Sequence, residues 1–247
     1  MPILNDTQLD HIALPNSHYG YSATRLDELG ATEYTIATIV ADVSGSTAAF
    51  TFDMESAIAR IVQACKFSPR ADNLLLRLIA FDDSLKEIHG FKLLENCHLA
   101  DYGGCLRSGR ATALFDATEN AVASTTNYAQ KLAAGDFSAN AILFVITDGM
   151  DNVSKSSAKR VRAAFAEAIR SEALESIVSV LIGVNVNDAQ VSRYLRNFHV
   201  EAGFTQYVEL ENADAKTLAR LAEFVSKSIS AQSQALGTGG ASQPLVF

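Results

Sequence analysis

The 247-residue sequence has no uninterrupted apolar run of about 18 residues, so it predicts no membrane-spanning helix. Basic residues are also few: 20 Lys and Arg stand against 28 Asp and Glu, which gives a formal net charge of −8. A protein that neutralises nucleic-acid phosphates needs a basic face, so this balance argues against a general nucleic-acid binder. The first twenty residues lack a basic segment followed by a long apolar run, and we do not expect them to form a secretory signal.

Cysteine is scarce, and its three positions form no C-x-x-C pair. Cys65 falls on the apolar face of a predicted helix, where we expect a buried free thiol. Cys97 and Cys105 are eight residues apart and can pair, although nothing in the spacing requires a disulfide. This usage is typical of a reducing compartment, so we expect a cytoplasmic protein.

Hydrophobic residues make up 48% of the chain and charged residues 19%, which excludes disorder as the dominant state. A chain of this length can bury one substantial core. Nearly all-apolar segments, the first of them rich in β-branched residues, predict strands that are buried on both faces, at 34–41, 74–81, 141–147 and 177–184, with a weaker candidate at 207–210. Residues 87–94 follow the second strand too closely for a crossover helix, so we expect an antiparallel strand at the sheet edge.

Apolar residues between the strands recur at helical spacing. Helices are predicted on this basis around 54–65, 113–132, 161–169, 189–198 and 218–229. Alternation of strands and helices predicts a Rossmann-like α/β fold: an open, mostly parallel sheet with one antiparallel edge strand and helices on both faces.

Both ends of the chain fall outside this alternation. Residues 1–33 are expected to be an N-terminal extension on or near the domain, with Pro15, Gly20 and Gly30 interrupting any regular element. Residues 34–231 form the predicted domain. The Ser-, Gln- and Gly-rich segment 232–247 is expected to be a flexible tail whose apolar end frays rather than docks.

Oxygen-bearing side chains gather where two predicted strands end. Asp42, Ser44 and Ser46 follow the first strand, and Asp148 follows the fourth. In the strand order 3-2-1-4-5-6 these two strands are neighbours, and their carboxyl ends flank the crevice where such sheets bind ligands. Thr112, at the start of the helix that leads into the fourth strand, offers a further hydroxyl. Carboxylate and hydroxyl oxygens suit a hard cation such as Mg²⁺ or Mn²⁺.

The pattern Asp42-x-Ser44-x-Ser46, followed by Thr112 and by Asp148 in a Thr-Asp-Gly setting, resembles the metal-ion-dependent adhesion site (MIDAS) of von Willebrand factor A (VWA) domains. The resemblance spans about residues 34–231. It implies that Ser44, Ser46 and Thr112 contact Mg²⁺ through their hydroxyls, with Mn²⁺ or Ca²⁺ as substitutes. Asp42 and Asp148 would act directly or through water.

The same resemblance implies a protein-interaction module that is not an enzyme. An acidic residue of the protein partner would complete the coordination of the metal. The segment HYGYSATRLDELGATEYT and the SQPLVF ending are similar to bacterial cytosolic VWA proteins of the type encoded beside tellurite-resistance genes. This further resemblance implies a role in a stress or signalling complex.

An alternative function is phosphoryl transfer of the haloacid-dehalogenase type, with Mg²⁺ and with Asp42 as the nucleophile. Enzymes of that type usually carry a general-acid Asp two residues later, where this chain has Ser44. No candidate for their lysine stands out either.

Other polar residues have ordinary structural interpretations. Asp151 and Asn152 are expected to be turn residues, although they can extend the acidic rim of the site. Asp82 and Asp83 are expected to be solvated loop carboxylates. The basic residues Lys155, Lys159, Arg160 and Arg162 are expected on an exposed helix face, or they can bind an acidic partner beside the metal. The histidines show no metal-ligand spacing, and surface or packing roles are expected for His11, His18, His89, His98 and His199.

Overall fold

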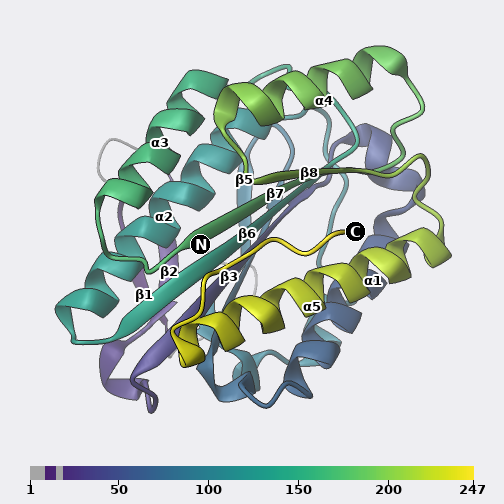
Figure 1. Ribbon diagram of the computed structural model, residues 1–247. Coiled ribbons are helices and arrows are strands. Elements are labelled where there is room, and N and C mark those ends of the chain that lie inside the picture. The colour runs from purple at the N-terminus through teal and green to yellow at the C-terminus, as the bar shows by residue number, and fades with distance from the viewer. Residues whose placement is uncertain (1–8, 15–18) are drawn as a thin grey trace.

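The computed structural model describes residues 9–14 and 19–247, so Pro15 and His18 lie outside it. Its centre is an eight-stranded sheet with the order β1-β2-β5-β4-β3-β6-β7-β8 (Figure 1). The strands are β1 (Leu9–Ile12), β2 (Tyr21–Thr24), β3 (Glu33–Asp42), β4 (Leu74–Phe81), β5 (Leu85–Leu93), β6 (Ser138–Thr147), β7 (Ile177–Gly183) and β8 (Gln206–Glu209). From β5 to β8 this is the predicted order 3-2-1-4-5-6, and the predicted α/β class is confirmed.

The first and fourth predicted strands, β3 and β6, are neighbours. They pair in parallel from Glu33 opposite Ser138 to Ala41 opposite Ile146, so their carboxyl ends lie side by side. β3 is buried from Tyr34 to Asp42 because helices cover both of its faces. The sequence prediction for this part of the sheet is therefore confirmed.

Helices α1 and α5 cover one face of the sheet, and α2, α3 and α4 cover the other (Figure 1). Their bounds are α1 (Thr51–Lys66), α2 (Leu114–Ala134), α3 (Ala158–Arg170), α4 (Ala189–Ala202) and α5 (Ala215–Thr238). The predicted apolar faces are buried except at two residues of α3: Ala164 is half-buried and Ile169 is 69% exposed. Val161, Phe165 and Ala168 form the buried stripe of α3. Ile169, the residue after Ala168, lies outside this stripe and faces solvent.

The N-terminal segment contains regular structure that the sequence prediction missed. β1 and β2 form an antiparallel pair, and β2 adds to β5 in parallel at Ala23 opposite Phe91. β5 is antiparallel to β4 as predicted, but the expectation that it lies at the edge is wrong because β2 pairs with its outer side. Gly90 permits this approach, since a Cβ there would lie 2.1 Å from the carbonyl oxygen of Ser22.

A buried ion pair lies beneath β2. The Arg77 guanidinium donates from Nε to the Glu87 carboxylate at 2.7 Å, and the Arg77 side chain is 1% exposed. Glu87 also accepts from the backbone N–H and the hydroxyl of Ser22. Burial lowers the pKa of Arg77, and Glu87 opposes that shift. The pair thus ties β4 and β5 to β2.

The C-terminal segment differs from the expected flexible tail. Helix α5 continues to Thr238, into the segment 232–247, and Gly239 ends it in the left-handed conformation. Ser242 then lies 2.6 Å from Ser176, hydroxyl to hydroxyl. The ring of Phe247 packs edge-on against Phe224, with 5.4 Å between the centroids. The apolar end therefore lies against α5 rather than frayed.

The three cysteines are buried and free, as predicted for Cys65, and Cys97 and Cys105 form no disulfide. Burial raises the pKa of Cys97 to about 11 and that of Cys105 to about 12. No helix in the described part of the chain is long and apolar enough to cross a bilayer.

Candidate metal centre

The centre begins at Asp42, the last residue of β3. Its carboxylate is 3% exposed, and Oδ1 accepts a hydrogen bond of 2.8 Å from the backbone N–H of Ser44. A 3-10 helix, Gly45–Ala49, follows and turns the chain back over the strand end. The hydroxyls of Ser44 and Ser46 lie 3.2 Å apart. The alternating pattern thus brings three oxygen-bearing side chains into one turn.

The second contribution comes from the end of β6. Ser46 donates its hydroxyl hydrogen to Oδ1 of Asp148 at 2.8 Å, and Thr147 donates to Oδ2 of Asp42 at 2.6 Å. Asp42, Ser44, Ser46 and Asp148 therefore belong to one hydrogen-bonded cluster. Asp42 and Ser44 are buried, Asp148 is half-buried and Ser46 is exposed, so the cluster opens to solvent on one side.

Thr112 lies just before α2, on a loop that packs against both strand ends. Gly109 donates its N–H to the carbonyl of Val43 at 2.6 Å, and a Cβ at Gly45 would lie 3.6 Å from the Gly109 carbonyl oxygen. On the other side, the N–H of Thr112 donates to Oδ1 of Asn152 at 2.9 Å. Thr112 is 5% exposed. Within the described chain its hydroxyl forms no hydrogen bond, so it is free to bind a ligand.

Burial dominates the electrostatics of the cluster. It raises the pKa of Asp42 to about 6, and the hydrogen bonds from Thr147 and Ser44 lower it only in part. Burial also raises the pKa of Asp148. Neither carboxylate has a Lys, Arg or His partner among residues 9–14 and 19–247. A cation is the charge that would stabilise both carboxylates in their ionised form.

The donor set is oxygen only: two carboxylates and three hydroxyls. No group of three or more His, Cys, Asp and Glu side chains in the described chain is arranged to hold a metal ion. Hydroxyl and carboxylate oxygens fit Mg²⁺ or Mn²⁺. Asp42, Ser44, Ser46, Thr112 and Asp148 are the residues that would hold such an ion.

Thr147 is a member of the cluster that sequence reasoning missed. Its register explains its role, because Ala41 pairs with Ile146 and the next residues along the two strands are Asp42 and Thr147. In the sequence, Thr147 is recognisable only as the residue before Asp148. Its role becomes clear once the pairing of β3 with β6 places it beside Asp42.

The structure gives Asp151 and Asn152 the turn roles that were predicted. Asp151 accepts from the N–H groups of Phe115 and Ser154, which holds the loop after β6 against the start of α2. Asn152 holds Thr112 in the same way.

The prediction for Asp82 is wrong. Its side chain is buried and bonds to Lys86 and Ser84 rather than to solvent, because the loop at Gly109 lies over it. A Cβ at Gly109 would lie 2.0 Å from Asp82 Oδ2, so only glycine permits this packing. Asp83 is exposed as expected.

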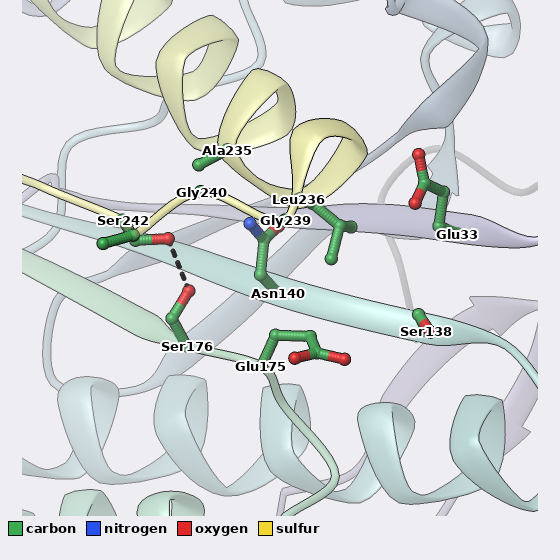
Figure 2. A pocket seen from close by; sticks show the side chains of 11 residues that line it. Glu33, Ser138, Asn140, Glu175, Ser176, Ala235, Leu236, Gly239, Gly240 and Ser242 are labelled. Carbon is green, nitrogen blue, oxygen red and sulfur yellow. Dashed lines mark hydrogen bonds between the residues drawn. The ribbon is translucent and has the colours of Figure 1, made fainter.

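A polar cavity of about 230 Å³ lies at the opposite end of the central strands, between the end of α5 and the amino-terminal ends of β3 and β6 (Figure 2). Glu33 and Glu175 are its carboxylates, and Ser176 and Ser242 meet across it. Glu33 is already paired with Arg70, which supplies its counter-charge. None of the five predicted metal ligands lines this cavity.

No protein-family model matches the sequence, and no curated protein is significantly similar to it. Several solved structures share the fold. The PilB minor pilin from Streptococcus sanguinis superposes with a TM-score of 0.58 at 16% identity, over 88% of this chain and 66% of that protein. Proximal thread matrix protein 1 from the mussel byssus, with a zinc-occupied MIDAS motif, gives 0.52 at 20% identity, over 81% and 46% of the two chains. The pilus adhesin SpaC from Lactobacillus rhamnosus GG in its open conformation gives 0.55 at 12% identity, over 81% and 30%.

These likenesses support a VWA-like fold for the chain. At 12–20% identity they define the fold alone. The chain spans two thirds or less of the length of each of these proteins. What those proteins assemble into or bind therefore applies to them and is not transferred to this chain.

Proposed function

We propose that Asp42, Ser44, Ser46, Thr112 and Asp148 form a MIDAS-type site that binds Mg²⁺ or Mn²⁺, and that the chain is a protein-interaction module rather than an enzyme. The observation that carries this proposal is the convergence of four of these side chains in one hydrogen-bonded cluster at the ends of β3 and β6. The cluster lies where open α/β sheets bind ligands.

Two further observations support a cation in particular. Asp42 and Asp148 share the cluster through Ser46 and Ser44, yet no basic side chain within residues 9–14 and 19–247 pairs with either. The hydroxyl of Thr112, on the adjoining loop, has no hydrogen-bond partner in the same part of the chain. A divalent ion would offset the cost of burying the two carboxylates and would use these free oxygens.

The bound ion would supply an electrophilic centre for a carboxylate of a protein partner. The residues of this chain would hold the ion and position it at the open side of the cluster, where Ser46 is exposed and Asp148 is half-buried. The zinc-occupied MIDAS motif of the solved neighbour, proximal thread matrix protein 1, supports metal binding at this site. The cytoplasmic location and the stress or signalling role stay predictions.

Phosphoryl transfer by Asp42 finds no support in the local geometry. The position of the general acid holds Ser44, whose hydroxyl faces that of Ser46.

A direct test is titration with Mn²⁺. Binding is measured by electron paramagnetic resonance as the loss of the signal of the free ion. Wild type should bind one Mn²⁺ that Mg²⁺ displaces, and S44A/S46A should not bind it. A control variant with two serines replaced away from the cluster, S138A/S230A, should bind like wild type. Equal Mn²⁺ binding by S44A/S46A would show that the ion lies elsewhere.

A further inference from the structure

Exposed cationic and apolar residues lie on segments that carry or adjoin the metal cluster. We call Phe52, Arg107, Arg110, Val153 and Lys155 the rim. They come from three segments: the start of α1, the loop before α2 and the loop after β6. The same three segments carry or adjoin the predicted metal ligands.

Backbone and side-chain contacts fix these segments beside one another. A Cβ at Gly45, in the metal-binding turn, would lie 3.8 Å from the carbonyl oxygen of Arg110. The hydroxyls of Thr51 and Ser108 lie 3.4 Å apart, which places the start of α1 next to the Arg107–Arg110 loop. On the other side, the N–H of Lys155 donates to Asp116, in the first turn of α2, at 3.1 Å.

The cations of the rim are exposed, and no carboxylate in the described chain pairs with them. Elsewhere in the described chain both situations occur: Arg25, Arg70, Arg160 and Arg196 form ion pairs, whereas no ion pair holds Arg60, Arg162 or Arg193. Arg107, Arg110 and Lys155 are therefore charges that a partner can use, on a chain whose net charge is −8.

The acidic residues of these segments are mostly engaged. Asp82 is held by Lys86, and Asp151 accepts from backbone N–H groups. Asp53 and Asp83 have no cation partner in the described chain, so the surface is mixed in charge. The loop that touches the metal-binding turn, however, is the cationic one, because Arg110 lies at the contact with Gly45.

Apolar surface accompanies these charges. Phe52 is 77% exposed and Val153 is 44% exposed, although each belongs to a segment that holds the cluster together. Phe67 is also exposed, at 82%, but Phe52 directly follows Thr51, which contacts the Arg107–Arg110 loop at Ser108. An aromatic side chain in that position can anchor a partner.

We infer that the rim binds an acidic segment of a partner protein, in which several carboxylates flank the one that reaches the metal and an apolar side chain packs on Phe52. This inference rests on the proposed function and specifies the partner. Arg107, Arg110 and Lys155 would attract the flanking carboxylates and orient the segment. Such charges act on specificity and association rate, and they weaken as salt is added.

The probe is a short fluorescein-labelled peptide of alternating Asp and Leu, with an Asn-Leu peptide as its control. Binding is followed by fluorescence anisotropy in Mg²⁺ and in EDTA, with Mn²⁺ binding measured on each variant in parallel. The variants are R107E/R110E and F52A. The matched charge-reversal control is R60E/K131E, which changes two exposed cations, in the middle of α1 and in the last turn of α2.

We expect the Asp-Leu peptide to bind wild type and the control in Mg²⁺, and more weakly when NaCl rises from about 50 to about 200 mM. R107E/R110E should bind it roughly tenfold more weakly, a loss of about 1.4 kcal/mol, while binding Mn²⁺ at least as well as wild type. F52A should also weaken peptide binding without changing Mn²⁺ binding.

The outcomes separate the two proposals. Failure of wild type to bind Mn²⁺ would overturn the metal site itself. Normal Mn²⁺ binding, with no peptide binding or with equal binding by R107E/R110E, would overturn the acidic partner and leave the metal site standing. Displacement of the peptide by a single-stranded oligonucleotide at lower concentration than by unlabelled peptide would assign the rim to nucleic acid instead.

Discussion

Thr147 donates its hydroxyl hydrogen to Oδ2 of Asp42 at 2.6 Å and so joins the ends of the two central strands, β6 and β3. Burial raises the pKa of Asp42, and this bond lowers it in part because it stabilises the ionised carboxylate. Because a metal ligand must be deprotonated, the hydrogen bond acts on metal affinity through the pKa of Asp42.

Replacement of Thr147 tests this relationship. T147V keeps the shape of the side chain but removes the donor, so the pKa of Asp42 should rise above about 6. Mn²⁺ affinity at pH 7 should fall about tenfold or more, and the pH at which binding is half-maximal should move upward. T147S retains the hydroxyl and should behave like wild type. Identical pH profiles for T147V and wild type would contradict a role of this bond in metal binding.

Asp42 should also make stability depend on pH when no metal is bound. Its pKa is raised from 3.8 to about 6, so the folded protein holds this proton in a range where the unfolded chain has lost it. The contribution of Asp42 to stability therefore falls as pH rises from about 4 to above 6. The full difference corresponds to roughly 3 kcal/mol.

D42N should consequently stabilise the metal-free protein. Its amide oxygen can still accept from the Ser44 N–H, and its amide nitrogen can donate to the Thr147 hydroxyl. The gain should be roughly 1 kcal/mol or more larger at pH 8 than at pH 5, measured by urea unfolding in EDTA. D83N, at an exposed aspartate, should show no such difference. A gain from D42N that is the same at both pH values would refute the burial effect.

Glu55 of α1 positions the loop that leads to Thr112. Its buried carboxylate accepts the N–H groups of Gly104 and Leu106 at 2.9 and 2.8 Å. E55A should cost about 1–3 kcal/mol for each N–H left without a partner. It should also weaken Mn²⁺ binding, because the segment that carries Thr112 is less firmly held. E223A, at an exposed glutamate, should change neither unfolding nor Mn²⁺ binding, and wild-type Mn²⁺ affinity in E55A would show that Thr112 does not depend on this loop.

The ion pair of Arg77 and Glu87 should matter more than any surface pair. E87A leaves the buried guanidinium without its carboxylate and removes the acceptor for Ser22, so it should cost about 3–5 kcal/mol in guanidinium unfolding. The double variant R77M/E87L removes both charges and should cost less than E87A alone. A double variant that is less stable than E87A would show that the pair contributes through its geometry rather than through charge compensation.

The central sheet was predictable because its strands have a distinctive apolar sequence pattern. Segments such as 34–41 and 141–147 are apolar on both faces, and they alternate with amphipathic helices, so the strand order follows from general rules of α/β folds. The predicted ligands follow directly from these strands, since Asp42 and Asp148 sit at their ends.

The parts that escaped prediction depend on contacts between distant segments. β1 and β2 are four residues long and carry no distinctive pattern, and β2 is fixed by its approach to Gly90 of β5. The end of the chain is held by Phe224 of α5 and by Ser176. Thr147 is informative only through its strand register with Asp42. Local sequence does not encode any of these pairings.

The central claim is that Asp42, Ser44, Ser46, Thr112 and Asp148 bind a divalent cation, and thermal unfolding in EDTA against millimolar Mg²⁺ or Mn²⁺ tests it most directly. A cation present at ten times its dissociation constant should stabilise the protein by about 1.4 kcal/mol, a shift of a few degrees in Tm. Wild type and S138A/S230A should show this shift, and S44A/S46A should melt at the same temperature with and without the ion. An equal shift in S44A/S46A, or none in wild type with either ion, would contradict the account.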